Sequence, residues 1–246
     1  MIQIGHVCEI VRYPVKSMAG IPTESASLGW HGLDGDRRFA FRRVGVEGGM
    51  PWLTASRLPE LVLYHPAGLD TSTGEPLPTH VRTPSGACLE LRSAELAAEL
   101  AGRFGGGVDL MKLNHGIFDE GAISVISLAT VAGIGREAGL ALDRRRFRAN
   151  IVVETESRET FVEDGWVGRM LVFGDGHPGP AVSVTTLDLR CKMVNVDPET
   201  AEQDARVMKT VVRLNRNNAG VYGTVVRSGT IRVGDRVALV PHADSP

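Results

Sequence analysis

Short stretches of β-branched and aliphatic residues, separated by Gly and Pro, recur along almost the whole chain and restrict its possible folds most strongly. Such stretches are typical of β-strands, because alternate side chains of a strand face opposite sides of a sheet. So many short strands favour a barrel or a sandwich. We predict strands at residues 6–11, 38–44, 61–64, 108–113, 151–153, 170–173, 182–185, 221–226 and 236–240.

Helical periodicity is confined to a few windows. Residues 94–101, 127–138 and 205–213 show it, with Ser127 and Asp204 in N-cap positions. Segments 67–79 and 174–180, rich in Gly and Pro, are predicted to be surface loops. A Gly-Asp pair between two alternating runs predicts a hairpin at residues 228–240. The fold class is therefore mainly β with a few helices (α+β).

Composition limits which partners the chain can bind and in which compartment it is expected. The chain of 246 residues has 27 Lys and Arg against 29 Asp and Glu, so no overall charge attracts nucleic acid or an anionic membrane. The first residues lack a secretory signal, and no apolar run is long enough to span a membrane. Three cysteines without a CxxC pair indicate reduced thiols rather than a disulfide framework. We expect a cytoplasmic protein with no nucleic-acid or membrane partner.

One segment concentrates the chemistry-bearing residues. Cys191 stands between Arg190 and Lys192 at the end of a β-branched run, and positive neighbours favour the thiolate form that soft metals and sulfur transfer require. An inert buried thiol is the alternative reading of the same residues. Cys8 and Cys88 lack flanking cations, and we expect both to be structural.

Residues 190–200, RCKMVNVDPET, resemble the signature loop of the MOSC family, in which Arg-Cys is followed by Val-Asp-Pro-x-Thr. Further matching segments occur in the family's order and cover essentially the whole chain: YPVKS at 13–17, GL at 32–33 with DRRF at 36–39, LTA at 53–55 with PEL at 59–61, FRANIVV at 147–153 and EDGW at 163–166. The resemblance is strongest to members with a smaller barrel domain in front, such as the mitochondrial amidoxime-reducing component. It implies a smaller N-terminal β-barrel domain at residues 1–115 fused to a MOSC β-barrel at 116–246.

The resemblance also implies a cofactor, a molybdopterin that carries molybdenum, with Cys191 as the protein ligand to the metal. Lys16 and Ser17 would hold its phosphate, since an ammonium and a hydroxyl suit a phosphate dianion. Arg37 would contact the pterin, although Arg38 beside it leaves open which side chain faces inward, and strand alternation allows only one. Pyridoxal phosphate binding also occurs in the family's descriptions.

Further residues receive roles by position in the family pattern. Those assigned to the cofactor are Arg148, Asn150, Arg190, Ser127 and Tyr222, with a helix cap as the alternative for Ser127 and an ordinary strand aromatic for Tyr222. Asp197 would handle a proton or order its loop, and the Val-Asp-Pro context equally predicts a turn cap. Arg144 and Arg145 are expected on a solvated basic face.

The function that follows from the resemblance is the reduction of N-hydroxylated or N-oxide small molecules by a molybdenum-dependent oxidoreductase. No iron–sulfur domain follows the terminal hairpin, so a separate ferredoxin-, flavin- or cytochrome-type protein is expected to supply electrons. Two alternatives stay open: a persulfide carrier or transferase acting through Cys191, and a non-enzymatic barrel that binds a pterin or a partner. Ser56-Arg57, where the family's arginine is displaced by one place, would alter the substrate entrance.

Overall fold

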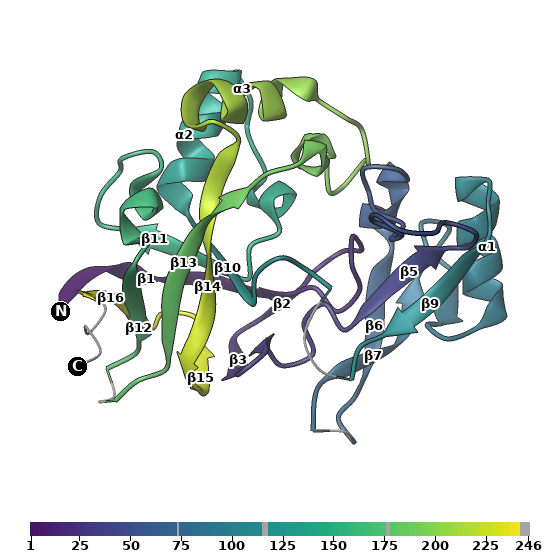
Figure 1. Ribbon diagram of the computed structural model, residues 1–246, viewed down its shortest axis with the longest axis horizontal. Helices are drawn as coiled ribbons and strands as arrows, with labels where there is room; N and C mark the ends of the chain where they lie inside the picture. Colours follow the sequence, from purple (N-terminus) through teal and green to yellow (C-terminus); the bar gives the residue numbers. More distant parts are fainter. Residues whose placement is uncertain (73, 115–117, 176–177, 242–246) are drawn as a thin grey trace.

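The computed structural model describes residues 1–72, 74–114, 118–175 and 178–241. Two lobes of β-structure lie side by side, the larger carrying helices α2 and α3 and the smaller carrying α1 (Figure 1). The predicted domain division at residues 115 and 116 falls outside the described residues and stays a prediction. No described helix combines the length and hydrophobicity needed to cross a membrane.

The larger lobe is built on a closed barrel of seven strands. Neighbouring strands follow the order β11-β10-β14-β13-β12-β16-β1, and pairing of β1 with β11 closes the ring. Only β10 and β11 are parallel, and helix α2 between them provides the crossover that parallel neighbours require. The strands are β1 (Ile2–Arg12), β10 (Ile123–Ser127), β11 (Ile151–Thr155), β12 (Arg169–Phe173), β13 (Ala181–Leu189), β14 (Asn218–Arg227) and β16 (Arg236–Pro241).

Strand β1 shows how the start of the chain contributes to the larger lobe. It pairs with β11 on one side and with β16 and β2 (Ile21–Thr23) on the other, so the first twelve residues help to close the barrel. Gly5 lies where β1 crosses close to β11, and a Cβ there would meet the backbone oxygen of Glu154 at 2.1 Å. Barrel closure therefore depends on a residue without a side chain at this position.

The predicted terminal hairpin is wrong as a pairing. Gly234 does make a turn, but β15 (Gly229–Arg232) pairs with β3 (Ser25–Gly29), while β16 pairs with β1 and β12. Strand β3 continues to β4 (Gly32–Leu33). An isolated two-stranded ribbon is only marginally stable. Pairing of β16 within the barrel and of β15 in the small sheet is therefore favoured over a local hairpin between them.

The smaller lobe packs two sheets and a helix around its own hydrophobic core. One sheet pairs β5 (Phe39–Arg43) with β9 (Val108–Lys112), and the other joins β6 (His65–Asp70), β7 (Leu77–Arg82) and β8 (Cys88–Glu90), with α1 (Ala94–Phe104) alongside. Of residues 61–64, predicted as a strand, the first three belong instead to the 3₁₀ helix η1 (Pro59–Leu63), which Pro59 initiates, and Tyr64 follows as its C-cap. The loop expected at 67–79 is shorter, because β6 and β7 extend into it as a hairpin.

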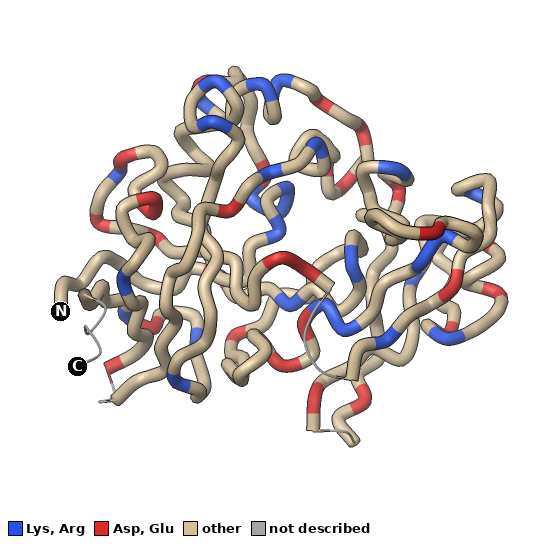
Figure 2. Tube along the Cα trace, in the orientation of Figure 1, with Lys and Arg blue, Asp and Glu red and all other residues tan. Residues whose placement is uncertain are grey.

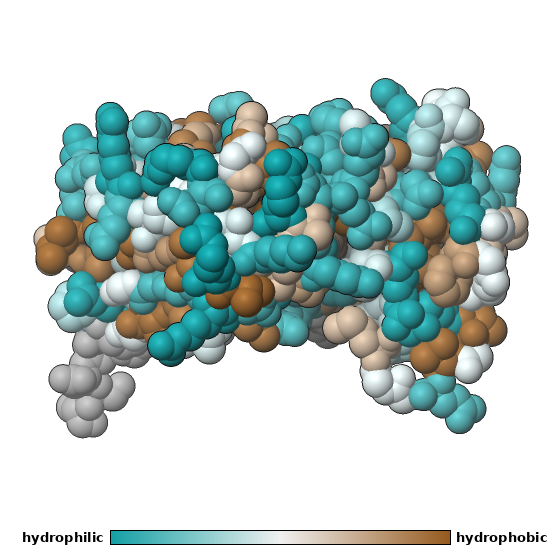
Figure 3. Space-filling model, turned by 90° about the horizontal axis from the view of Figure 1, so that it is seen from above, coloured by the Kyte–Doolittle hydropathy of each residue, from teal (hydrophilic) through white to brown (hydrophobic). Residues whose placement is uncertain are grey.

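The three predicted α-helices are present in the described residues, and their caps agree with the sequence. Ser127 accepts a hydrogen bond from the Thr130 backbone at the start of α2 (Leu128–Ala138), and Asp204 does the same for α3 (Ala205–Asn215). Both helices pack over the barrel around a third apolar cluster. The face above them is mostly hydrophilic, with small separate hydrophobic areas (Figure 3). Short 3₁₀ helices complete the lobe: η2 (Arg144–Phe147), η3 (Val162–Trp166) and η4 (Lys192–Asn195).

Candidate functional site at the junction of the two lobes

Cys191 lies two residues after the long strand β13 and directly before η4, at the edge of the larger lobe. Its side chain is exposed, and its Sγ lies 3.9 Å from the hydroxyl of Ser56, which comes from the smaller lobe. The inert buried alternative is therefore wrong for this thiol. An accessible sulfur at a boundary between two lobes can coordinate a metal or attack an electrophile.

Arg190 makes its contacts within the fold. Its guanidinium is buried, donates to the carbonyls of Ala219 and Phe147 at 2.6 Å, and lies 2.7 Å from the Asp188 carboxylate. These contacts fix the end of β13 against β14 and η2, which orients the following cysteine. A direct role of Arg190 toward a ligand stays a prediction, since Nε and Nη1 donate to backbone carbonyls and Nη2 has only the Asp188 carboxylate beside it.

Lys16 and Ser17 form the turn after β1, directly beside the junction. The Lys16 ammonium donates to the Phe118 carbonyl at 2.7 Å. Burial lowers the pKa of Lys16, Asp119 opposes that shift, and a thiolate at Cys191 would also favour the charged amine, so these groups lie within electrostatic reach. Ser17 is buried, with its Oγ 3.9 Å from the sulfur of Met193, just after Cys191. The structure thus brings Lys16, Ser17 and the cysteine loop together.

Arg37 and Arg38 are both buried, but they contact different residues. Both residues precede β5 and both are buried, because the chain turns here and Arg37 has a positive φ of 45°. Arg37 points to the junction, donating to Asn150 Oδ1 and the Arg148 carbonyl at 2.9 Å. Arg38 binds both oxygens of Glu75 at 2.7 and 2.8 Å. Both side chains are buried because the alternation rule holds only within a strand, but their contacts differ, and which of them faces a cofactor stays a prediction.

Arg148 and Asn150 lie between the barrel and the junction. The Arg148 guanidinium stacks 4.1 Å from the Tyr13 ring centroid, and its Nη1 donates to the Met18 carbonyl. Its Nη2 is buried and has no hydrogen-bond partner among the described residues, and burial lowers the pKa of Arg148 to about 10. Asn150 is buried, accepting from Arg37 and from the Ser124 amide, so it positions Arg37.

Asp119 is the residue of this site that sequence reasoning missed. Its carboxylate lies 2.6 Å from Arg37 Nε and accepts from the Tyr222 hydroxyl at 3.4 Å. Burial would raise the pKa of Asp119, but Arg37 and then Lys16 outweigh it and hold the pKa below the usual range. Burial, Asp188 and Asp119 together raise the pKa of Tyr222. The signal in the sequence was weak, a carboxylate four residues before the buried strand β10.

Two residues predicted for the site lie in other networks. Ser127 is fully buried, and besides capping α2 it donates to Glu163 Oε2 at 2.7 Å, as Thr130 does. Asp197 accepts from the amides of Glu199 and Thr200 and from Arg146 at 2.6 Å. The cap alternative describes Ser127 here, and the turn-cap alternative describes Asp197. Arg144 and Arg145 are exposed, as expected.

The backbone is also unusual at this junction. Ser17, Arg37 and Arg148 all adopt the left-handed conformation, with φ of 69°, 45° and 52°. This region costs non-glycine residues roughly 1 kcal/mol each and persists where surrounding contacts enforce it. Basic segments of both lobes lie along the same boundary, with an acidic segment between them (Figure 2). The junction is thus a preorganised cluster of cations beside an accessible thiol.

Comparisons with known proteins agree with this architecture. A family model described as MOSC domain matches residues 112–238, just over half of the chain, and one described as MOSC N-terminal beta barrel domain matches residues 4–99. The chain belongs to the MOSC domain family. No curated protein matches this MOSC protein.

Solved structures add a similarity of fold alone. The YUAD protein from Bacillus subtilis shares 14% sequence identity with a TM-score of 0.52, over 97% of each chain. YiiM from Geobacillus stearothermophilus shares 17% identity with a TM-score of 0.37, covering 49% of this chain and 54% of that one. The first comparison supports the order and arrangement of the strands in this MOSC protein.

The donor set of the junction fits the molybdenum cofactor associated with MOSC domains. Cys191 offers an exposed sulfur, the soft donor that molybdenum in such a cofactor would take from the protein. Lys16 offers an ammonium for the phosphate. The unpartnered Nη2 of Arg148 offers a buried donor for a pterin or phosphate oxygen.

Proposed function

We propose that this MOSC protein is a molybdenum-cofactor-dependent oxidoreductase that reduces N-hydroxylated or N-oxide small molecules, with Cys191 as ligand to the metal. The observation that carries the proposal is the meeting of one exposed thiol with cations from both lobes. Ser56 stands 3.9 Å from the sulfur, and Lys16 lies within its electrostatic reach. A soft thiolate beside phosphate-binding cations is the donor set that such a cofactor needs.

The residues of the chain divide the work of binding and orientation. Lys16 and Ser17 would hold the phosphate, and Arg148 would donate to the pterin. Arg37 is held by Asp119 and Asn150, so it supports the positions of both loops. When bound, the cofactor supplies two-electron redox chemistry at molybdenum, while the protein supplies position and electrostatics.

The proposed reaction is a two-electron, two-proton reduction. A substrate R₂N–OH takes up two electrons and two protons and leaves as R₂NH and water, with cleavage of the N–O bond. The electrons would come from a separate ferredoxin-, flavin- or cytochrome-type protein. The exposed position of Cys191 leaves the reacting centre open to a small substrate and to such a donor.

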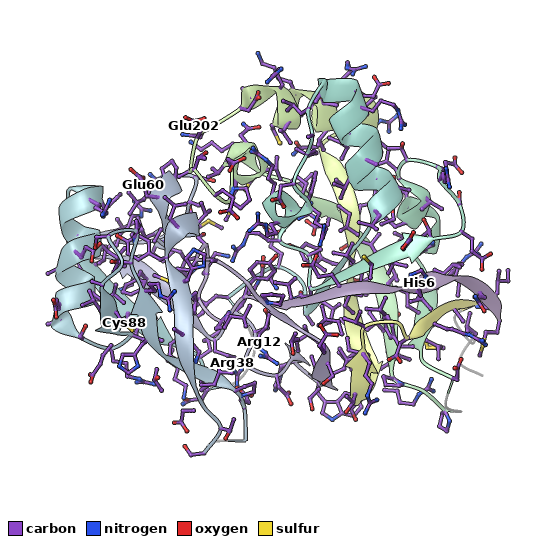
Figure 4. The ribbon with its side chains drawn as sticks, turned by 180° about the vertical axis from the view of Figure 1, so that it is seen from behind. His6, Arg12, Arg38, Glu60, Cys88 and Glu202 are labelled. Carbon is purple, nitrogen blue, oxygen red and sulfur yellow. The ribbon has the colours of Figure 1, made fainter. Side chains whose placement is uncertain are left out.

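Molybdenum and pterin content provide the decisive experiment. The wild type and the C191S and C88S variants are purified from a host that makes the cofactor. Cys88 is a matched control, since it is also exposed but lies on β8 of the smaller lobe (Figure 4). We expect near-stoichiometric molybdenum and pterin in the wild type and C88S, and loss of molybdenum in C191S. Absence of both from the wild type contradicts the proposal.

An activity assay separates the redox function from sulfur transfer. The loaded protein is given an N-hydroxylated amidine and a chemical reductant, and the amidine product is measured. We expect turnover by the wild type and C88S but not by C191S. A persulfide on Cys191 in metal-free protein that still transfers sulfur would replace this proposal with the carrier function.

A further inference from the structure

The contact between Ser56 and Cys191 joins the two lobes at the sulfur atom itself. The hydroxyl oxygen of Ser56 lies 3.9 Å from Sγ of Cys191, a distance at which a hydroxyl and a sulfur form a weak hydrogen bond. Ser56 belongs to the smaller lobe, whereas Cys191 follows strand β13 of the larger lobe. A polar group of one lobe therefore acts directly on the candidate metal ligand of the other.

Ser56 lies in a turn that the smaller lobe holds on both sides. The amides of Arg57 and Leu58 donate to the Thr54 carbonyl at 2.8 and 3.0 Å, which closes the turn. Ala55 before the serine and Leu58 after it are buried in the hydrophobic cluster of the smaller lobe. Because both neighbours are anchored in a packed core, the position of the hydroxyl is well defined.

The backbone around Cys191 is held in the same way. The Arg190 amide donates to the Asn217 carbonyl at 2.8 Å, and the Val194 amide donates to the Cys191 carbonyl at 3.2 Å. Val196, in the loop after the cysteine, is buried in the hydrophobic cluster of the smaller lobe. This burial docks the cysteine loop on the smaller lobe, so the distance between the hydroxyl and the sulfur is fixed from both sides.

The side chain beside the sulfur is small and neutral. The arginine that the family pattern places after Leu-Thr-Ala comes one position later here, as Arg57. Arg57 is exposed, and its side chain has no hydrogen bond or ion pair with the described residues. A serine hydroxyl can both donate and accept, whereas a guanidinium can only donate. Ser56 thus contacts the sulfur and leaves Cys191 exposed.

We propose that Ser56 is a positioning residue of the candidate site, whose hydroxyl donates a hydrogen bond to the Cys191 sulfur and holds it in one orientation for the metal. Hydrogen bonds to a metal ligand orient the ligand and tune the metal, and their removal typically lowers metal affinity or activity about 10- to 100-fold. The role toward the metal rests on the proposed function, but the hydrogen bond does not. The smaller lobe then acts on the metal through the sulfur.

Raman spectroscopy of metal-free protein tests the hydrogen bond. In a C8A/C88S background Cys191 is the only cysteine, and the S–H stretching band of its thiol form reports a hydrogen bond in either direction. S56T and S56V have the same shape, but only S56T keeps a hydroxyl. We expect the band of S56V to shift and that of S56T to stay at the position of the parent protein. An unshifted band in S56V overturns the proposal.

Retention of molybdenum tests the positioning role. The wild type, S56T, S56V and R57Q are purified from a host that makes the cofactor, and the metal content is followed after gel filtration. We expect S56V to lose molybdenum about tenfold faster than the wild type, while S56T and R57Q retain it. Equal retention by S56V and S56T, or an equally fast loss from R57Q, would show that the hydroxyl does not hold the ligand.

The two measurements separate this inference from the proposed function. A wild type that binds no molybdenum contradicts the proposed function, and the Raman comparison alone then decides the contact between Ser56 and Cys191. A wild type that binds molybdenum, with an S56V variant that keeps both the thiol band and the metal, overturns the inference and leaves the proposed function standing. Thermal unfolding of S56T and S56V at the same temperature excludes a difference in folding as the cause.

Discussion

Nε of Arg37 lies 2.6 Å from the carboxylate of Asp119, and this ion pair joins the turn before β5 to the turn before β10. Arg37 is also held by Asp36 and Asn150, whereas Asp119 reaches on to Tyr222. The pair thus connects side chains from both lobes at the point where the candidate cofactor site forms. Its geometry makes Asp119 a positioning residue of that site.

Replacing Asp119 by Asn should lower the free energy of unfolding by about 2 kcal/mol at pH 7, because a largely buried charge-assisted contact is lost. Arg37 and Lys16 hold the pKa of Asp119 below its usual value, although burial opposes them. Stabilisation from this group is therefore complete above the unfolded pKa of about 3.9 and disappears as the pH falls through the lower folded pKa. Urea unfolding at pH 7 and below pH 4 measures both effects.

The matched control for that change is D109N. Asp109 pairs with Arg42 at 2.8 Å, but both side chains are about half exposed, so its loss should cost less than about 1 kcal/mol. D119N and D109N with the same pH dependence of stability would show that the Arg37 pair contributes nothing special to the fold.

Lys16 can be tested for its role toward a phosphate. K16Q removes the ammonium beside the junction and should weaken retention of the phosphate-bearing pterin about tenfold. K192Q is the comparison, because Lys192 is exposed next to Cys191, whereas the Lys16 ammonium donates to the Phe118 carbonyl. Pterin content after gel filtration gives the measurement. Equal loss from both variants would argue against a specific phosphate contact of Lys16.

Replacing Ser127 tests whether this serine stabilises the fold or binds the cofactor. S127A removes the cap of α2 and one of the hydroxyl donors to the fully buried Glu163, so we expect a loss of about 2–4 kcal/mol of unfolding free energy. S93A removes the α1 cap alone and should cost about 1 kcal/mol. At temperatures where S127A is folded, the variant should keep its molybdenum. A folded S127A protein that lacks the cofactor would support the cofactor-binding role that the family pattern implies for Ser127.

Closure of the barrel depends on Gly5. In G5A the new Cβ would meet the Glu154 backbone oxygen at 2.1 Å, so β1 and β11 must separate, and we expect a loss of more than about 3 kcal/mol or failure to fold. G165A adds a Cβ that meets nothing within 4 Å, and it should change stability by less than about 0.5 kcal/mol. Thermal unfolding followed by circular dichroism compares the two. Similar midpoints would mean that the β1–β11 approach is easily relaxed.

Particular elements show how far the sequence leads. The periodicity around residues 127–138 and the serine before it predicted α2 and its cap correctly, and the β-branched runs located most barrel strands. Pro59 begins the 3₁₀ helix that includes residues 61–63, but the hydrophobic run there favoured the prediction of a strand. The Gly-Asp turn at 234 was correct, but its two strands do not pair with each other, because β15 pairs with β3 and β16 pairs with β1 and β12.

The sequence by itself determined most of the local elements, the place of a cysteine between two cations and membership of the MOSC family, because these depend on neighbouring residues and on the order of motifs. Only the tertiary structure decided that β1 closes the barrel, that both Arg37 and Arg38 are buried, that Arg190 anchors backbone carbonyls, and that Asp119 belongs to the site. Each of these depends on contacts between residues far apart in the chain. The free energy of such contacts comes from burial and charge pairing in the folded state, which no local pattern records.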